Sequence, residues 1–357
     1  MNADGNRQNA LSTGSLTVEH ETKFGGVYLQ ISIADFLSLG FEFGDSLEIS
    51  FDNGYSLSDV PFYNGYYTKT ARPLVCGYPG YPYIDLCENN GRDLWDAAGL
   101  TKDSIASVTL GEKGRFMAVQ QAMNLRYSCF REDFDSDIAF ANFRALSGGK
   151  LKKDFFFRSA SPCDDQYGRA ETADRLMREN GVRFILNLAD SKDDVSRYEE
   201  RGFFPGFQAL YAEGNVALLD LSANYKSDVF KRRLADGLRT LIRSEGPYLT
   251  HCTEGKDRTG FVCALLEALA DASYAEIAED YMITYDCYYG VKAENDPEKY
   301  LTIRELKFDG YLRDIAGVGE DANLEGLRYA PGAKEYLRSC GMTGEEIGAL
   351  LKRICDP

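Results

Sequence analysis

Residues 251–260 read His251-Cys252-Thr253-Glu254-Gly255-Lys256-Asp257-Arg258-Thr259-Gly260 and carry the strongest structural signal in the chain. Residues 247–251 have the character of a short strand. The residues after Thr259 predict a helix with one apolar face. The intervening loop therefore joins a strand to a helix N-terminus. Backbone N–H groups at such an end point at a bound anion, and the helix dipole favours negative charge, so the pattern predicts a phosphate site.

The chemistry expected of this loop centres on Cys252. The field that attracts an anion also stabilises a thiolate, which is the nucleophilic form of cysteine. Arg258 adds a planar guanidinium that can bind two phosphate oxygens, and Thr259 offers a hydroxyl group to the thiolate. The candidate substrate-binding residues of the loop are Thr253, Glu254, Gly255, Lys256, Thr259 and Gly260.

Other residues are expected to shape the site. Gly255 and Gly260 permit tight turns and a close approach of the backbone to the anion. Lys256 supplies a second cation for a polyanionic substrate, or else pairs with a neighbouring carboxylate at the surface. His251 ends the strand and points behind the cysteine, so we expect it to hydrogen-bond the loop rather than carry a proton.

A second segment has the same spacing and serves as a control. Cys163 and Arg169 are also six positions apart. However, Asp164 and Asp165 would repel an anion there, and no apolar strand precedes the cysteine. Because short motifs recur by chance, context has to decide between the two segments. We therefore expect Cys252, and not Cys163, to be a nucleophile.

The pattern His-Cys-x-x-Gly-Lys-Asp-Arg-Thr-Gly resembles the phosphate loop of the cysteine-dependent phosphatases, most closely the bacterial branch of atypical tyrosine and phosphoinositide phosphatases. Residues 142–144, 157–160, 276–281 and 341–347 also resemble that branch, so the resemblance spans 127–357. It implies an α/β fold with a central, mainly parallel sheet. It also implies hydrolysis of phosphomonoesters through a phosphocysteine intermediate, which needs no metal or other cofactor.

Cleavage of a phosphomonoester needs a proton donor for the leaving oxygen, and a carboxylic acid is the usual one. Asp220 ends a predicted strand at 216–219 and lies 32 residues before Cys252, a spacing that resembles that of dual-specificity and lipid phosphatases. We rank it first, although an Asp at a strand end is often a turn or cap residue. Asp257 is the second candidate, or else orients the loop through a salt bridge, and Asp190 is a distant third.

Composition limits the possible partners. The chain has 357 residues, 40 Lys and Arg against 56 Asp and Glu, and a net charge of -16. This sign disfavours nucleic acid and anionic membranes. No apolar stretch approaches the roughly 20 residues of a membrane span, and no signal peptide is visible. The nine cysteines lack CxxC pairs, so we expect reduced thiols and a cytoplasmic location, while a secreted or processed form stays open.

Three regions follow from the pattern along the chain. Residues 1–24 are expected to be a flexible lead, 25–126 a small β-rich accessory domain, and 127–357 an α/β catalytic domain. In the second region Leu47, Ile49 and Phe51 alternate with polar residues and precede Asp52-Asn53-Gly54, which is a hairpin signal. Expected strands in the third region lie at 154–158, 183–188, 216–219 and 248–251, and expected helices at 170–180, 228–243 and, as a pair, 333–354.

Several segments allow two interpretations. The tyrosines of 62–83 could form a sugar- or protein-binding face but fit packing within the small domain better. Residues 285–300 could wall the active site or be a surface loop. Lys150, Lys152 and Lys153 could form a second basic patch, although a solvated lead-in to a strand is the simpler interpretation. Residues 133–137 begin like a calcium loop but lack its turn glycine, so we expect no metal site.

The leading hypothesis is a metal-independent protein-tyrosine phosphatase. A phosphoinositide phosphatase is the first alternative, because Lys256 would favour a polyanionic head group. A catalytically idle module that binds phosphorylated ligands is the second. The net charge disfavours the lipid substrate, and an intact Cys252 and Arg258 disfavour the idle module.

Overall fold

The computed structural model describes residues 11–22, 25–89, 91–200, 202 and 204–356. The chain divides into two compact units, residues 1–125 and residues 126–357. The division falls next to the boundary expected from the sequence. Among the described residues, no helix is both long and apolar enough to cross a membrane.

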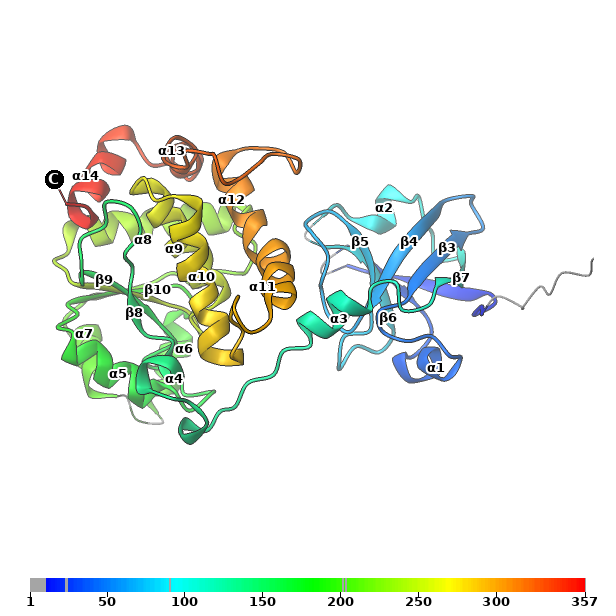
Figure 1. The fold of residues 1–357 in the computed structure, drawn as a ribbon, viewed down its shortest axis with the longest axis horizontal. Coiled ribbons are helices and arrows are strands. Elements are labelled where there is room, and N and C mark those ends of the chain that lie inside the picture. The colour runs from blue at the N-terminus through cyan, green and yellow to red at the C-terminus, as the bar shows by residue number, and fades with distance from the viewer. Residues whose placement is uncertain (1–10, 23–24, 90, 201, 203, 357) are drawn as a thin grey trace, which may run out of the picture. The chain divides into compact units, whose positions relative to one another are not determined.

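The first unit is a closed barrel of seven strands in the order β1-β2-β6-β5-β4-β3-β7 (Figure 1). Neighbouring strands are antiparallel except β4 and β5, which are parallel. The strands are β1 (Leu16–Glu21), β2 (Gly26–Leu29), β3 (Ser46–Phe51), β4 (Ser56–Tyr63), β5 (Pro73–Cys76), β6 (Ile84–Glu88) and β7 (Ile105–Glu112). Three short helices accompany them: α1 (Ile33–Ser38), α2 (Leu94–Ala97) and α3 (Met117–Met123).

The predicted hairpin of this unit is confirmed. Leu47, Ile49 and Phe51 are buried in the barrel core, as their alternation indicates. The turn after Phe51 joins β3 to β4, and Gly54 adopts a φ of 87° there, which favours glycine. The side chain of Asn53 accepts a hydrogen bond from the backbone N–H of Tyr55 at 2.9 Å, which stabilises the turn.

The prediction of a flexible lead over residues 1–24 is wrong for its second half. Residues 16–21 form β1, which pairs with both β2 and β7 and so closes the barrel. Leu16 and Val18 are buried while Thr17 and Glu19 are exposed, so this short segment has the alternation of a strand. Its polar composition hid that pattern. Residues 1–10 and 23–24 lie outside the described residues.

The tyrosine-rich segment divides between core and surface. Tyr63 is buried with Leu74 and Cys76 in a small cluster. The hydroxyl of Tyr66 donates to that of Tyr81 at 3.1 Å, and Tyr78 is 44% exposed. Packing therefore accounts for part of the segment, and partner binding stays a prediction.

The second unit has an α/β fold, as predicted, built on a five-stranded sheet in the order β11-β10-β12-β9-β8. Four strands run parallel and the edge strand β8 is antiparallel to β9. Their bounds are β8 (Arg144–Ala145), β9 (Phe156–Ser159), β10 (Phe184–Asn187), β11 (Val216–Leu218) and β12 (Tyr248–His251). β9, β10 and β12 are entirely buried, which is typical of parallel strands covered on both faces.

Helices cover both faces of this sheet. In Figure 1, α5, α6 and α7 lie on one side, and α8, α9, α13 and α14 lie on the other. Three predicted helical regions are confirmed as α5, α8 and the pair α13 and α14. The helical elements are α4 (Asp137–Ala141), α5 (Ala170–Glu179), α6 (Lys192–Glu199), α7 (Pro205–Ala212), α8 (Asp228–Arg243), α9 (Asp257–Leu269), α10 (Tyr274–Tyr289), α11 (Pro297–Ile303), α12 (Asp309–Ala316), α13 (Ala330–Ser339) and α14 (Gly344–Ile354), with a short 3₁₀ helix at Arg131–Asp133 and a short π-helix at Arg304–Phe308.

Candidate active site

The phosphate loop lies at the carboxyl end of the central strand β12. Cys252 directly follows His251, the last residue of β12, and its side chain is only 3% exposed. The loop then leads into α9, whose first residue is Asp257. Among the described residues, no side chain caps the N-terminus of α9. Its first N–H groups are therefore available to an anion, as expected for a phosphate site.

Gly255 is required by both conformation and space. Its φ is 68°, and a Cβ atom there would lie 2.2 Å from the carbonyl oxygen of Ser159. Gly260 has a different role from the one expected. Its N–H already donates to the carbonyl of Lys256 at 2.8 Å within α9, and a Cβ atom would lie 2.6 Å from the ring of Tyr281. Gly260 therefore serves helix packing, and its backbone N–H is already engaged, so its assignment to substrate binding stays a prediction without a contact that supports it.

Arg258 connects the loop to the segment after β11 through two hydrogen bonds. Its Nη1 donates to the carbonyl of Leu221 at 3.1 Å, and its Nη2 donates to the hydroxyl of Thr253 at 3.2 Å. Both acceptors are neutral, so no carboxylate competes with a phosphate for the guanidinium in these contacts. The side chain is thereby oriented while its charge stays available to an anion.

The structure places Asp220 next to Leu221 but directs its carboxylate toward α8. Asp220 adopts a φ of 44°, and its Oδ2 pairs with Nη1 of Arg233 at 2.7 Å. The side chain is half exposed. The same guanidinium also donates to the Asp220 carbonyl oxygen. The backbone after β11 thus reaches the loop, whereas proton donation by Asp220 requires this ion pair to open.

Lys256 is mostly covered by its neighbours, with 17% of its side chain exposed. Its Nζ lies 3.2 Å from a carboxylate oxygen of Glu254, 3.8 Å from one of Asp257 and 3.3 Å from the hydroxyl of Tyr289. Burial alone would lower the pKa of the ammonium, but Asp257 and Glu254 outweigh it and raise the pKa well above its ordinary value. The two carboxylates hold this cation inside the loop, so it is less available to a second phosphate than the sequence indicated.

Tyrosines from outside the loop surround it, and α10 supplies most of them. The hydroxyl of Tyr288 donates to the backbone carbonyl of Glu254 at 2.6 Å, and the hydroxyl of Tyr127 donates to the Glu254 carboxylate. The rings of Tyr127 and Tyr288 stack at 5.3 Å. The first part of 285–300 is therefore helix and contacts the loop, so the alternative of a packed surface loop is wrong there. No local sequence pattern marks Tyr127 as a residue of the site.

Behind the loop, a buried group of charged residues holds the carbonyl of Gly255. Nη2 of Arg158 and Nδ2 of Asn142 donate to it at 2.8 Å and 3.1 Å. Asp280 on α10 pairs with both Arg158 and Arg144, at 2.5 Å and 2.7 Å. Burial would raise the pKa of Asp280, but the two guanidiniums prevail and lower it. These residues occur in the stretches that carried the family resemblance, which was the available signal, although it assigned them no role.

His251 and Thr259 are both fully buried. The Nδ1 atom of His251 lies 3.2 Å from the carbonyl oxygen of Cys252, as expected for a residue that supports the loop. Burial lowers the pKa of His251 to about 4, although the charge of Asp190 opposes this. The histidine is therefore neutral at pH 7. Neither Nε2 of His251 nor the hydroxyl of Thr259 has a hydrogen-bond partner among the described residues.

Cys163 has surroundings of a different kind. It is buried, and its Sγ lies 3.4 Å from the hydroxyl of Ser161 and 3.7 Å from a carboxylate oxygen of Asp190. Burial, with the nearby Asp190 charge, raises the pKa of this thiol well above its ordinary value. Asp190 also accepts hydrogen bonds from Asn187 and Tyr198, at 2.8 Å and 3.1 Å. The structure therefore uses Asp190 in a hydrogen-bond network around Cys163.

Comparison with known proteins supplies independent information. Residues 139–356 match the model of a family described as the tyrosine phosphatase family. A tyrosine-protein phosphatase of Nostoc commune is 30% identical over 218 residues, which cover 59% of this chain and 68% of the relative. The triple specificity protein phosphatase PtpB of Mycobacterium tuberculosis is 30% identical over 113 residues, which cover 28% of this chain and 41% of PtpB.

Two solved structures also align with the chain. Pseudomonas aeruginosa TpbA is 17% identical over 65% of this chain and 98% of its own, with a TM-score of 0.27. The catalytic core of the PP-IP phosphatase SIW14 from Saccharomyces cerevisiae, solved with citrate, is 16% identical over 49% of this chain and 94% of its own, with a TM-score of 0.26.

Proposed function

Because the chain belongs to the tyrosine phosphatase family, we propose that its second unit hydrolyses phosphomonoesters through a phosphocysteine intermediate on Cys252. The observation that carries the proposal is a buried cysteine between the end of β12 and an uncapped N-terminus of α9, within the described residues. A phosphoryl group placed there meets the nucleophile, the helix N–H groups and the Arg258 guanidinium together.

The proposed reaction has two steps. In the first, Sγ of Cys252 forms a bond to phosphorus while the ester P–O bond breaks, and a carboxylic acid gives its proton to the departing oxygen. In the second, water forms a new bond to phosphorus, the S–P bond breaks, and the carboxylate takes a proton from that water. Arg258 and the loop N–H groups stabilise the equatorial oxygens in both steps. The buried hydroxyl of Thr259 is a suitable donor to the departing thiolate.

Two carboxylates are proposed as the proton donor. Asp220 must first leave Arg233, an ion pair of which both partners are partly exposed and which is therefore worth only about 0–1 kcal/mol. Asp257 is half exposed at the start of α9 and lies 3.8 Å from Lys256. We keep Asp220 first, because Leu221 beside it already bonds Arg258 and so brings this segment to the loop.

Phosphotyrosine protein is the proposed substrate, and a phosphoinositide is the alternative. Tyr127 and Tyr289 are partly exposed near the loop and provide aromatic surface suited to a phenyl ring, whereas Tyr288 is buried against Tyr127. Lys256, which favoured a polyanionic head group, is engaged with Glu254 and Asp257. The name of the mycobacterial relative includes triple specificity, so both substrate classes should be assayed. The barrel of residues 1–125 is proposed to be an accessory domain that binds a partner.

The test measures hydrolysis of para-nitrophenyl phosphate with EDTA present, for the wild type and for Cys252→Ser. We expect the serine variant to lose at least about 10⁴-fold in kcat, since its nucleophile is removed. Cys163→Ser is the matched control and should retain activity. Retained turnover in Cys252→Ser would refute the proposal. Phosphate-analogue binding by a wild type without turnover would instead identify a module that only binds phosphorylated ligands.

The same assay across pH distinguishes the two acids. If Asp220 is the donor, Asp220→Asn flattens the acidic optimum while Asp257→Asn keeps it, and the reverse assigns Asp257. Rates on phosphotyrosine peptides and on soluble phosphoinositides, measured side by side, then decide the substrate class. Comparable rates would indicate dual activity.

A further inference from the structure

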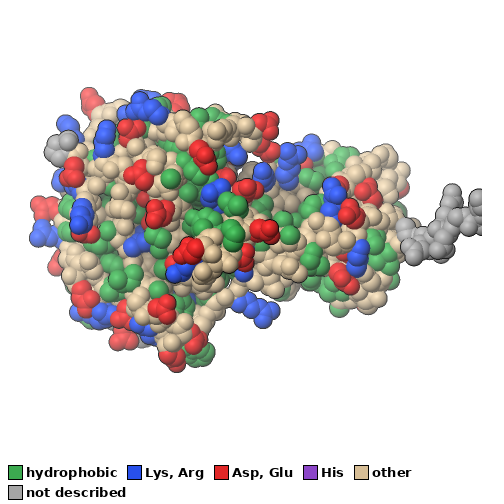
Figure 2. All heavy atoms as spheres, in the orientation of Figure 1, with side chains coloured by type: hydrophobic (Ala, Val, Ile, Leu, Met, Phe, Trp, Pro, Cys, Tyr) green, Lys and Arg blue, Asp and Glu red, His purple; other side chains and the backbone are tan. Residues whose placement is uncertain are grey.

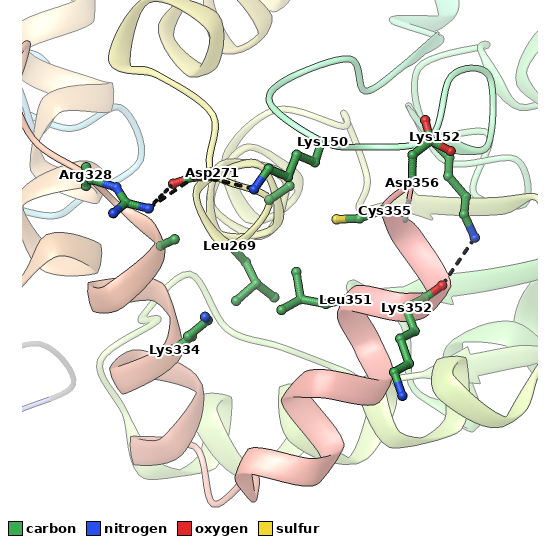
Figure 3. Close-up of a pocket in the computed structure, with 12 residues that line it drawn as sticks. Lys150, Lys152, Leu269, Asp271, Arg328, Lys334, Leu351, Lys352, Cys355 and Asp356 are labelled. Carbon is green, nitrogen blue, oxygen red and sulfur yellow. Dashed lines mark hydrogen bonds and ion pairs between the residues drawn. The ribbon is translucent and has the colours of Figure 1, made fainter.

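A second concave site lies in the phosphatase unit away from Cys252. Its volume is about 460 Å³, which is within the range of small-molecule pockets. The end of α9, the start of α13, the end of α14 and the loop before β9 form its walls (Figure 3). Cys252 precedes the first residue of α9, whereas Leu269 at its last residue lines this pocket. The 13 residues of α9 separate the two sites by roughly 20 Å, so they are distinct.

Cations predominate around this pocket. Its lining includes five of them against two carboxylates, in a chain whose net charge is -16. On the face drawn in Figure 2, basic and acidic side chains of this unit are interspersed, so the excess of cations is a local feature. The charged residues of the lining are Lys150, Lys152, Arg328, Lys334, Lys352, Asp271 and Asp356. The sequence left open a basic patch at Lys150, Lys152 and Lys153. In the structure, cations from distant segments join Lys150 and Lys152 around the pocket.

The cations differ in how firmly they are engaged. Nζ of Lys152 donates to the backbone carbonyls of Lys352 and Arg353, at 3.3 Å and 2.9 Å, so this lysine stabilises the end of α14. Lys150 lies 3.6 Å from Asp271 and its side chain is 68% exposed, which makes a weak ion pair. Asp271 keeps a shorter contact of 3.1 Å to Arg328. An incoming anion can therefore bind Lys150, because Asp271 would still be paired with Arg328.

Lys334 and the pocket floor complete the site. The side chain of Lys334 has no hydrogen-bond or ion-pair partner within the described part of the chain. Figure 3 shows the ends of Lys150 and Lys334 on either side of Leu269, which faces Leu351. A ligand there would meet two ammonium groups and an apolar surface at once. Lysine binds phosphate as a compact point charge, and apolar side chains favour a carbon chain or ring.

We propose that this basic pocket binds an organic phosphate, with its phosphate group between Lys150 and Lys334 and its carbon part against Leu269 and Leu351. A soluble metabolite and the head group of a membrane lipid share this chemistry. The site does not use the residues of the phosphate loop, so it does not depend on the proposed catalytic function.

Isothermal titration calorimetry with hexylphosphonate, which cannot be hydrolysed, tests the proposal on the full chain. We expect two sites in the wild type, the pocket and the phosphate loop. Lys150→Ala/Lys334→Ala should weaken one site by about tenfold or more, because two contacts to a dianion are lost. Arg258→Ala should weaken the other site only. Lys102→Ala/Lys192→Ala removes the same charge from two exposed lysines elsewhere and should leave both sites unchanged.

Two further measurements use the wild-type protein, so they do not depend on whether the variants fold. Amine labelling of the wild type, read by mass spectrometry, should show protection of Lys150 and Lys334, but not of Lys192, by hexylphosphonate. Methylphosphonate should bind the pocket more weakly, by up to about fourfold for each methylene that it lacks. A single site that only Arg258→Ala removes, or equal affinity for the two phosphonates at the pocket, would overturn the proposal.

Vesicles containing phosphatidic acid distinguish the two sources of the phosphate. Vesicle binding that is lost in Lys150→Ala/Lys334→Ala supports the lipid source, and binding of the soluble phosphonate alone supports a metabolite. An acidic peptide that binds through these lysines while hexylphosphonate does not would refute the organic phosphate and indicate a protein ligand.

Discussion

Two segments of the phosphatase unit place an arginine six positions after a cysteine, but their surroundings differ. Cys252 directly follows β12, and no side chain caps α9 within the described residues. Cys163 comes four positions after Ser159, the end of β9. There the carboxylate of Asp165 accepts a hydrogen bond from the N–H of Ala170, at 3.1 Å, and so occupies the start of α5.

The two arginines differ in the same way. Within the described residues, the hydrogen bonds of the Arg258 guanidinium go to two neutral groups, the Leu221 carbonyl and the Thr253 hydroxyl. Arg169 is buried, donates to the backbone carbonyls of Phe140 and Ser128 at 2.8 Å and 2.9 Å, and packs on the rings of Tyr127 and Tyr288. Spacing alone therefore does not make an anion site. What matters is whether the helix N-terminus and the guanidinium are already satisfied by the protein.

Exchanging each arginine for lysine should separate a catalytic arginine from a structural one. Arg258→Lys should lower kcat by roughly 10²–10³-fold, because an ammonium group cannot reproduce the planar contacts to the equatorial oxygens. Its free energy of unfolding should change little. Arg169→Lys should lower kcat less than about tenfold but lower the free energy of unfolding by about 3 kcal/mol, since buried carbonyls lose a charged donor. Steady-state kinetics and urea unfolding measure the two effects.

The reversed pattern of effects would contradict this distinction between the two arginines. If Arg169→Lys abolished turnover at unchanged stability, the second segment would belong to the reaction itself. Far-UV circular dichroism suits the phosphatase unit because most helices are there, whereas Trp95, the single tryptophan, reports on the barrel unit.

The contrast also shows how far the sequence predicts the fold. Alternation of apolar and polar residues predicts the hairpin after Phe51, and an apolar helical face predicts α8. Both predictions succeed because each element buries one of its sides. β1 was missed, since only Leu16 and Val18 mark its buried face and its stability comes from pairing with two distant strands. The strand expected at 154–158 is confirmed as β9, and because it ends four positions before Cys163, the expectation that no apolar strand precedes this cysteine is wrong.

For the site, the sequence identified the loop but not what holds it. Arg158 donates to the loop carbonyl of Gly255 and pairs with Asp280. Each contact joins residues more than 90 positions apart, and no local pattern reports such contacts. The direction of the Asp220 carboxylate depends on Arg233 in the following helix, which strand-end chemistry alone does not determine. Residue types and spacing predict the nucleophile, whereas tertiary packing selects the neighbours.

The next effect in size concerns pH and His251. The pKa of this histidine is about 4 in the folded protein, against an ordinary value of 6.5 in an unfolded chain. Between these two pH values the unfolded chain therefore binds more protons than the folded protein. The contribution of neutral His251 to the free energy of unfolding is therefore complete above pH 6.5. As the pH falls toward 4, the free energy of unfolding decreases by up to about 3 kcal/mol. In His251→Asn this part of the pH dependence should disappear, as measured by urea unfolding followed by circular dichroism from pH 4 to 7.

His20 provides the control for that measurement. It is the other histidine of the chain and lies in the barrel unit, where its ring stacks on Trp95 and pairs with Asp93 at 2.9 Å. His20→Asn should leave the pH dependence of the phosphatase unit unchanged. An equal loss of pH dependence in both variants would mean that burial behind Cys252 is not its cause.

The smallest effect tests whether the second segment supports the first. Tyr288 contacts both, since its ring lies 4.7 Å from the Arg169 guanidinium and its hydroxyl donates to the Glu254 carbonyl. Tyr288→Phe removes only the hydrogen bond, worth about 1 kcal/mol, and should lower kcat by roughly fivefold. Tyr288→Leu also removes the ring from Arg169 and should lower the free energy of unfolding by about a further 1 kcal/mol. Equal stability of the two variants would show that Arg169 does not depend on this ring, and the two segments would then be independent.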